Sequence, residues 1–290
     1  MQPITLLLLL AFCIHSVLSA PQHVETWRFD NWSKYKNDKA AKGGSWASEW
    51  GIPKSSGWAW PKDGGNYDIV KDPSGSSDMV LRVEYPKGSS NPANTPQGGI
   101  GFYAQPIELR EEAKLVVLEY KLFFPKGFDF VKGGKLPGLY GGHEGCSGGA
   151  DASSCFSTRF MWRKEGAGEI YAYMPESKQR DGLCDEEGNI CNPNYGYSLG
   201  RGTWTFKTGE WVTLKQRVKL NTPGQQNGQA EVLVNGKQVY NEKQLAFLSK
   251  KTGRLTGLAF HTFFGGSDDS WAPPKEEHTF FKDFKVWAYY

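Results

Sequence analysis

The sequence predicts an all-β fold, a sandwich or a barrel built from short strands. Runs rich in β-branched and aromatic residues recur along the chain, and clusters of glycine, proline and serine separate them. The chain contains 35 glycines and 14% aromatic residues, which suits many strands joined by tight turns, with large side chains between the sheets. A series of eight or more such strands is typical of sandwiches and barrels.

The predicted strands can be placed in order along the chain. They cover residues 79–85, 115–124, 156–163, 169–174, 211–220, 229–240, 255–264 and 279–289. The glycine, proline and serine clusters at 52–66, 86–99, 141–154 and 221–228 are predicted to be loops. Asn235 and Gly236 predict a hairpin, because both tolerate the positive φ angles of a type I′ turn. A short helix is expected around 242–250.

The first residues differ from the rest of the chain. Residues 6–14 form one short apolar run followed by small residues, a pattern typical of a secretory signal peptide and too short to span a bilayer. We expect a leader over residues 1–19, cleaved after Ser19 or Ala20, and a single domain over residues 20–290. The expected location is extracellular, and Asn31 begins a glycosylation sequon.

Four cysteines follow the leader: Cys146, Cys155, Cys184 and Cys191. An even number in a secreted chain predicts two disulfides. Three pairings are open, and the short spacings favour Cys146 with Cys155 and Cys184 with Cys191. A four-thiolate zinc site is disfavoured because no C-x-x-C spacing occurs, and no metal or cofactor is expected.

The formal net charge of +3 is too small to make the whole surface polycationic, so an anionic partner must be bound by a local cluster. Lys215, Arg217 and Lys219 share one face of a predicted strand and are expected to help attract a polyanion. The chain carries no recognised nucleic-acid motif. We therefore expect a monomer with neither a nucleic acid nor a membrane as partner.

Two predicted strands place reactive side chains opposite an apolar face. In 156–163 the alternation puts the aromatic residues on one face and polar residues on the other, which carries Ser157, Arg159, Met161 and Arg163. In 169–174 the corresponding face carries Glu169, Tyr171 and Tyr173. Upstream, Lys135 lies between a glycine pair and a proline, and we expect it on a stiff turn.

At these residues the chain resembles polysaccharide lyase family 14, whose members include alginate lyases and lyases that cut glucuronic-acid chains. The resemblance rests on a lysine in a K-L-P-G-L segment, a Ser-x-Arg strand and a Tyr-x-Tyr strand, which here are Lys135, Ser157 with Arg159, and Tyr171 with Tyr173. A later F-F-G-G turn followed by W-A-P extends it over roughly residues 115–275.

The resemblance implies a β-jelly-roll of two antiparallel sheets, with a substrate cleft on one sheet. It also implies β-elimination on an anionic, 4-linked polyuronate, either β-1,4-glucuronan or polymannuronate in alginate. Removing the C5 proton requires that the adjacent carboxylate be neutralised, and Lys135 and Arg159 are the candidate neutralisers. Tyr171 or Tyr173 is the candidate base and acid, because adjacent cations favour the phenolate and lower the pKa of tyrosine.

Three further residues are candidates for substrate binding, namely Ser157, His143 and His261. His278, beside two glutamates, is expected on a solvated face. Two other classes of protein remain open. A non-catalytic sugar-binding module would use exposed tryptophans, and the candidates are Trp46, Trp50, Trp58, Trp60 and Trp204. A glycoside hydrolase would need two carboxylates flanking the scissile bond, and no E-x-D-x-x-E pattern occurs.

Overall fold

The computed structural model describes residues 23–36, 41–54, 57–149, 152–192, 195–249, 254–266 and 268–290, and for residues 41–43 the backbone alone. The signal peptide predicted for residues 1–19, with its cleavage position, lies outside the described residues. No helix in the described residues has the length and apolar composition that a bilayer span requires.

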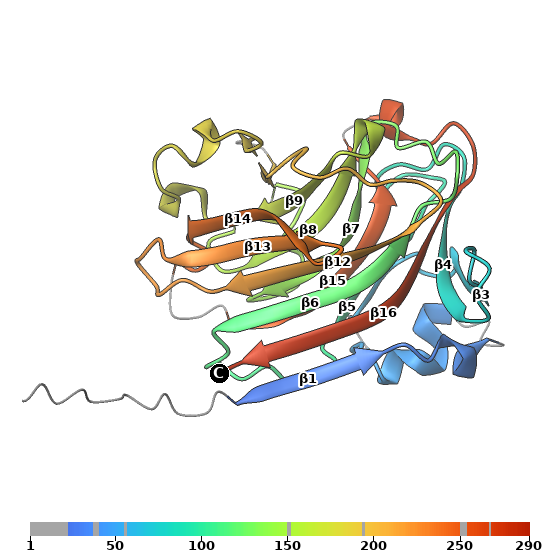
Figure 1. Cartoon of the computed structure of the whole chain (residues 1–290), viewed down its shortest axis with the longest axis horizontal. Helices are drawn as coiled ribbons and strands as arrows, with labels where there is room; N and C mark the ends of the chain where they lie inside the picture. Colours follow the sequence, from blue (N-terminus) through green and yellow to red (C-terminus); the bar gives the residue numbers. More distant parts are fainter. Residues whose placement is uncertain are drawn as a thin grey trace, which may run out of the picture.

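Two antiparallel sheets face each other in two layers (Figure 1). Sheet A has the order β14-β13-β12-β6-β16-β4-β3, and β1 pairs with the second half of β16. Its strands are β1 (Val24–Phe29), β3 (Tyr67–Lys71), β4 (Met79–Tyr85), β6 (Leu115–Phe123), β12 (Trp211–Lys219), β13 (Gly228–Val234), β14 (Lys237–Leu245) and β16 (Glu277–Tyr289).

Sheet B has the order β10-β11-β9-β8-β7-β15-β5-β2. Its strands are β2 (Trp58–Trp60), β5 (Ile100–Ala104), β7 (Gly133–Gly141), β8 (Phe156–Arg163), β9 (Gly168–Tyr173), β10 (Ile190–Cys191), β11 (Tyr197–Leu199) and β15 (Leu255–Phe264). The helices of the described residues are short 3₁₀ turns at Trp32–Tyr35, Ala41–Ser48, Lys164–Gly166, Glu176–Lys178, Leu183–Asp185 and Asp269–Trp271. The all-β fold with two antiparallel sheets is therefore confirmed.

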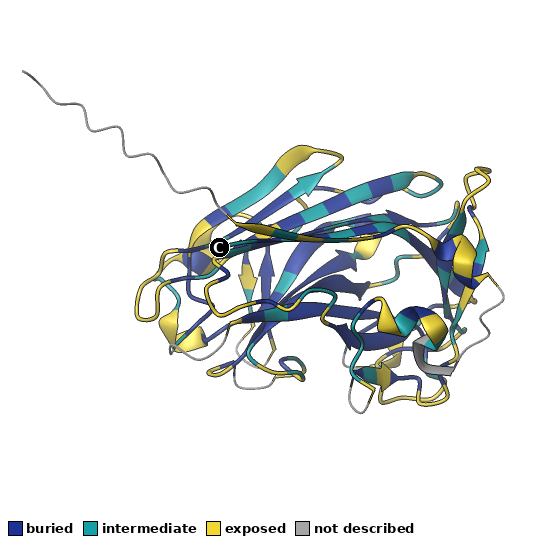
Figure 2. Cartoon of the chain, turned by 90° about the horizontal axis from the view of Figure 1, so that it is seen from below, coloured by how far each residue is buried: buried dark blue, intermediate teal, exposed yellow. Residues whose placement is uncertain are grey.

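The hydrophobic core lies between the two sheets. Alternate residues of β8, among them Phe160 and Trp162, are fully buried in it, and the ring of Phe160 lies 6.2 Å from that of Tyr120 in β6. Figure 2 shows buried residues along both layers of strands, while exposed residues gather in loops and turns. Because side chains alternate along a strand, the other residues of β8 point away from this core.

The segment around Lys135 is a central strand, not the expected turn. β7 pairs with β8 on one side and β15 on the other, and its pairing with β8 is interrupted between Lys135 and Gly138, around Pro137. A proline has no backbone N–H to donate to a neighbouring strand. A central strand therefore tolerates a proline only where its pairing is interrupted, as at this bulge. A Cβ on Gly134 would lie 2.1 Å from the Trp162 ring, so that glycine allows the close approach of β8.

The expected helix around 242–250 is also wrong, since the chain continues β14 as far as Leu245. Pairing with β13 decides the structure here, and the Glu242 side chain accepts a hydrogen bond of 3.1 Å from Arg180. The predicted hairpin is confirmed. Asn235 and Gly236 join β13 to β14 with φ angles of 50° and 81°.

The basic side chains of β12 differ from what we expected. Lys215 pairs with Glu119 at 2.7 Å and Arg217 with Glu231 at 2.8 Å, so each has a carboxylate partner. β12 belongs to sheet A, whereas the strands that carry Lys135, Arg159 and the two tyrosines belong to sheet B. Two of the three cations are thus neutralised, which leaves this stripe poorly suited to attract a polyanion.

Candidate active site

Three separate stretches of sequence meet on the face of sheet B that points away from the core. Arg159 in β8 is paired with Tyr171 in β9, and Lys135 lies across from Met161 on the other side of β8. The Lys135 Nζ lies 3.4 Å from the centre of the Tyr171 ring, and the Arg159 Cζ lies 5.5 Å from that of Tyr173. The two phenol rings are 5.7 Å apart. The structure therefore brings the cation pair and the tyrosine pair together.

Arg159 is a buried cation without a carboxylate. Its exposed fraction is 3%, and no acidic side chain of the described residues forms an ion pair with it. Its Nη1 lies 3.3 Å from His261 Nδ1, while its own Nε has no hydrogen-bond partner. A buried charge is costly unless an opposite charge or hydrogen bonds compensate it. This guanidinium is therefore well placed for an anionic ligand.

His261 shares the site with Arg159, and its protonation follows from that contact. A guanidinium only donates hydrogen bonds, so Nδ1 of His261 must accept, and the proton of the neutral ring lies on Nε2. Burial and the adjacent Arg159 hold the pKa of His261 well below its usual range. The buried Nε2 has no partner. His261 can thus donate one hydrogen bond to a ligand, which suits the substrate-binding role predicted for it.

Lys135 lies in a strongly electropositive environment. Burial lowers the pKa of Lys135 well below its usual range, and the nearby guanidinium groups of Arg159, Arg163 and Arg201 lower it further. The carboxylate of Glu169 acts in the opposite direction without reversing the shift. The Nζ donates to the Met161 sulfur at 2.9 Å, a weak acceptor that gives an ammonium group little compensation. These contributions shift the equilibrium of Lys135 towards the neutral amine.

Tyr171 behaves differently from the sequence prediction. Burial and the neighbouring Tyr173 raise the pKa of Tyr171 to about 12, although Arg163 and a hydrogen bond from the Gly196 amide act to lower it. The prediction that adjacent cations lower the pKa of this tyrosine is wrong, because the loss of water costs the phenolate more than the cations return. At neutral pH Tyr171 is a phenol and can donate a proton.

Several aromatic residues that complete the site lay outside the sequence prediction. The His261 ring lies 4.9 Å from Trp60 and 4.7 Å from Tyr103. Tyr103 in turn lies 4.9 Å from Tyr140, and burial raises the pKa of Tyr140 to about 12. Trp60 was considered only as a general sugar-stacking candidate. Tyr103 could not be found because its strand β5 is apolar and buried along its whole length.

The remaining candidate tryptophans belong to the core. Trp46, Trp50 and Trp204 are buried in the cluster between the sheets, and Trp58 packs against it. The three buried rings are unavailable for stacking on a sugar, which removes most of the sequence support for a non-catalytic sugar-binding module.

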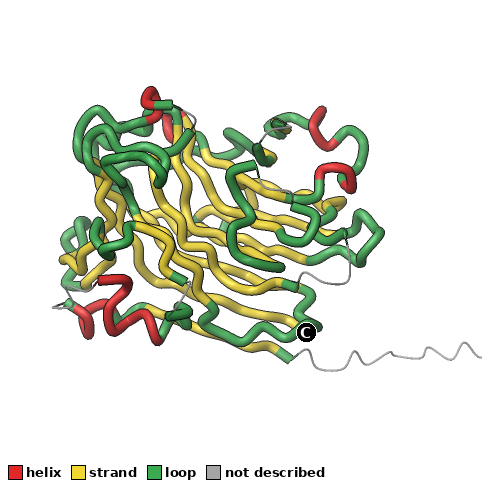
Figure 3. The backbone as a smooth tube through the Cα atoms, turned by 180° about the vertical axis from the view of Figure 1, so that it is seen from behind, coloured by secondary structure: helices red, strands yellow, loops and turns green. Residues whose placement is uncertain are grey.

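A disulfide-closed loop is attached to the site from outside the sheet. Cys146 pairs with Cys155, and the Gly145 and Gly148 amides donate to the hydroxyl groups of Tyr103 and Tyr173 at 2.8 and 3.0 Å. Figure 3 shows loops crossing in front of the strands in the view from behind. The disulfide pairings favoured by the spacing are confirmed, since Cys184 also pairs with Cys191.

The other two predicted binding residues serve this loop. The Ser157 hydroxyl donates to the Cys146 carbonyl at 2.8 Å, so it holds the loop to β8. His143 is exposed, and its ring nitrogens lie 2.7 Å from the Glu144 carbonyl and 3.1 Å from the Ser154 hydroxyl. Neither side chain joins the contacts around Arg159, and both remain predictions as substrate ligands.

Removing the Cys146–Cys155 disulfide should lower activity by more than the accompanying loss of stability would cause. We expect replacement of both cysteines by serine to lower kcat/KM about 10- to 100-fold. The freed loop would no longer hold the hydroxyl groups of Tyr103 and Tyr173 in place, and a shift of about 1 Å in a site is enough for such a loss. The Cys184–Cys191 disulfide provides a matched control, because it closes a loop of similar length. Its cysteines are 7 residues apart, and those of Cys146–Cys155 are 9 residues apart. Both double variants should lose about 2–3 kcal/mol of stability. Equal kinetic losses in the two would contradict the positioning role.

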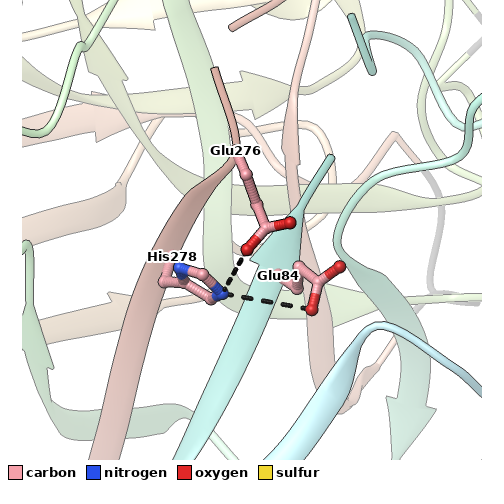
Figure 4. Close-up of side chains that lie close together, drawn as sticks. All are labelled: Glu84, Glu276 and His278. Carbon is pink, nitrogen blue, oxygen red and sulfur yellow. Dashed lines mark ion pairs between the residues drawn. The ribbon is translucent and has the colours of Figure 1, made fainter. Parts of the chain in front are cut away.

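A second polar cluster lies on the outer side of sheet A (Figure 4). His278 Nε2 lies 3.4 Å from Glu276 and 4.0 Å from Glu84, and the three potential ligand atoms lie within 4.8 Å of one another. Burial and Arg82 lower the pKa of His278, which is half-buried rather than on the solvated face we expected. These three residues are the described group that could hold a cation, and they belong to the sheet opposite Arg159.

Comparison with known proteins identifies the family of this chain. The family model described as "Polysaccharide lyase 14" matches residues 73–284, well over half of the chain. Two solved structures share the fold closely. The PL-14 alginate lyase of Aplysia kurodai is 37% identical with a TM-score of 0.71, covering 78% of this chain and 88% of that one. The alginate lyase vAL-1 of a Chlorella virus is 26% identical with a TM-score of 0.70, covering 89% and 97%.

One curated protein also matches. The "Exolysin" of Paramecium bursaria Chlorella virus 1 is 28% identical over 173 residues, which are 52% of this chain but 26% of the viral protein. This chain therefore spans about a quarter of the length of that relative. The comparisons confirm the predicted resemblance, the class of polysaccharide lyases and the jelly-roll architecture.

Proposed function

The chain belongs to polysaccharide lyase family 14, and we propose that it cleaves a 4-linked polyuronate by β-elimination. The observation that carries the proposal is Arg159, a buried guanidinium with no acidic partner among the described residues. A uronate carboxylate would supply the missing charge and could accept hydrogen bonds from Arg159 and from the Nε2–H of His261. This would also withdraw electron density from the neighbouring C5–H bond.

The elimination needs one base and one acid, and both are adjacent to this position. In our proposal the neutral Lys135 amine removes the C5 proton, the C–H electron pair forms the C4=C5 double bond, and the C4–O4 bond breaks. The Tyr171 phenol gives its proton to the departing O4. One proton is taken and one is given, and no water is consumed. The short distance between the Lys135 Nζ and the Tyr171 ring, 3.4 Å, supports acid and base acting on the same side of the sugar.

This assignment changes two roles that the sequence suggested. Lys135 was expected to neutralise the carboxylate, but a neutral amine is better suited to accept a proton. Tyr171 was a candidate for both steps, but a pKa of about 12 leaves little phenolate at neutral pH to act as base. Arg159 keeps the neutralising role, because an arginine stays charged under these conditions. Tyr173 packs against Arg159 and binds the disulfide loop.

Among polyuronates we propose alginate, and within it the mannuronate chain, as the substrate. The support is twofold: the two related structures are described as alginate lyases, and same-side elimination suits mannuronate. Glucuronan has the same arrangement at C4 and C5 and is the second choice. We further propose that the protein is secreted, which agrees with its apolar amino-terminal run and two disulfides.

A direct test is to incubate the purified protein with polymannuronate, polyguluronate and glucuronan in parallel. We expect ultraviolet absorbance from new C4=C5 double bonds to appear with polymannuronate, and more slowly or not at all with the other two. Reducing sugar released without this absorbance would indicate a hydrolase. Binding without either product would indicate a sugar-binding module, and in both cases the proposal would fail.

A further inference from the structure

We propose that Arg163 and Arg201, held together by the buried Glu169, form a second carboxylate-binding site for another uronate residue of the same polymer chain. The inference rests on the proposed function and extends it. It assigns a substrate contact to two arginines that take no part in the elimination described above, and it predicts that the protein distinguishes long polyuronates from short ones.

The geometry of the cluster is that of two guanidinium groups sharing one carboxylate. Glu169 has an exposed fraction of 0%, and its two oxygens lie 2.7 Å from Arg163 Nη2 and 2.6 Å from Arg201 Nε. The Ser198 hydroxyl accepts from Nη2 of both arginines at 3.2 and 2.6 Å. These bonds fix both guanidinium planes, so little side-chain entropy remains to be lost when a ligand binds.

The cluster carries an unbalanced positive charge. One carboxylate neutralises one guanidinium, and the side chains of Arg163 and Arg201 remain 14% and 31% exposed. The Nη1 atoms of both arginines have no hydrogen-bond partner within the described part of the chain. Lys135 is affected by both cations, which help to lower its pKa. An anion is what this arrangement lacks, and a carboxylate fits the guanidinium fork.

The position of the cluster suits a neighbouring sugar and not the reacting one. Arg159 and Arg163 point to the same face of β8 and are four residues apart, which corresponds to about 13 Å along a strand. Tyr171 pairs with Arg159 in the strand register, and the Arg163 Cζ lies 5.5 Å from its ring. β8 and β9 run side by side in the sheet (Figure 1), so a chain that lies along them would contact both cationic groups.

An aromatic surface continues beyond the cluster. The Arg163 Cζ lies 5.8 Å from the Trp271 ring, and the Lys132 Nζ lies 6.0 Å from the same ring. Trp271 is only partly buried, unlike the core tryptophans. Such a ring offers a flat apolar surface to a sugar, flanked by cations that suit its carboxylate.

The test replaces Arg201 by methionine. This substitution removes the unbalanced charge and leaves the Arg163–Glu169 pair intact, so no buried charge loses its partner. We expect KM for polymannuronate to rise about tenfold while kcat changes far less, and the rise to shrink as mannuronate oligosaccharides are shortened towards the trimer. Arg201→Lys, which keeps the charge without the fork, should fall between wild type and Arg201→Met.

A second measurement separates binding from turnover. In a Lys135→Met background, polymannuronate should bind about tenfold more weakly when Arg201→Met is added. Arg180→Met is the control, since it likewise removes an arginine that pairs with a buried glutamate, Glu242, but Arg180 lies outside this cluster. An Arg201→Met variant that stays folded and keeps the wild-type KM and affinity for the polymer would overturn the second site alone. A wild-type protein that forms no unsaturated product from any polyuronate would overturn both proposals.

Discussion

Replacing Lys135 by methionine should lower kcat on polymannuronate by about 10²- to 10⁴-fold, the range expected for loss of a general base. Methionine fills a similar volume beside Met161 and carries no charge, so the variant should fold. KM should change much less than kcat, because Arg159 and His261 remain to bind the carboxylate. Initial rates of absorbance increase at saturating polymer would measure the effect, with circular dichroism to verify the fold.

Two further variants make the role of Lys135 specific. Lys135→Arg keeps a positive charge but cannot accept a proton at neutral pH, so it should be nearly as inactive as Lys135→Met. If Lys135 served only to neutralise the carboxylate, the arginine variant would retain most of the activity. Lys164→Met removes a lysine near the same end of the sheet whose side chain is 78% exposed, and it should leave kcat at the wild-type value.

The lowered pKa of Lys135 also predicts how stability depends on pH. Between its lowered folded pKa and about 10.4, the unfolded chain binds a proton that the folded protein lacks, so wild-type stability rises with pH. Lys135→Met lacks this dependence. The variant should therefore unfold at a higher temperature than wild type at pH 7, with a difference that shrinks towards pH 10.4. A difference that does not vary with pH would show that the amine is not neutral, and Lys135 could not then be the base.

The sequence predicts several strands well from their β-branched and aromatic residues and the glycine, proline and serine clusters that flank them. Residues 79–85, 156–163 and 255–264 coincide with β4, β8 and β15. The alternation of side chains along a strand placed Arg159, Met161 and Arg163 on one face of β8 and Glu169, Tyr171 and Tyr173 on one face of β9. Period-two patterning is local, so it identifies which residues share a face before the partner strands are known.

The remaining differences come from contacts that are distant in sequence. The sequence of β7 resembles a turn because it is rich in glycine and contains a proline. Gly134 is needed instead for the close packing of the Trp162 ring, a contact that the local sequence does not reveal. The pKa values of the site residues depend on burial, and part of that burial comes from a loop closed by Cys146 and Cys155. From the sequence alone, a tyrosine predicted to lie beside an arginine is expected to have a lowered pKa. That expectation cannot include the loss of water that raises the pKa of Tyr171.

Tyr171→Phe and Tyr173→Phe should differ sharply in kcat although they remove the same atom from neighbouring positions of one strand. We expect Tyr171→Phe to lose about 10²- to 10⁴-fold, because the departing O4 would leave without a proton. The Tyr173 hydroxyl instead accepts a hydrogen bond from the Gly148 amide, so its removal loosens the disulfide loop. Its loss should appear mainly in KM. Steady-state kinetics of both variants on polymannuronate would decide between the two roles.

The pH dependence of the tyrosine pair gives this comparison a second readout. A phenol that acts as the acid must stay protonated, so the wild-type rate should fall on the alkaline side only when pH approaches the raised pKa of Tyr171, about 12. A phenolate base would produce the opposite slope, with the rate increasing up to that pH. If both phenylalanine variants lose activity mildly and equally, neither hydroxyl transfers a proton. The acid must then be sought elsewhere, with Tyr103, beside His261, and its neighbour Tyr140 as the alternatives.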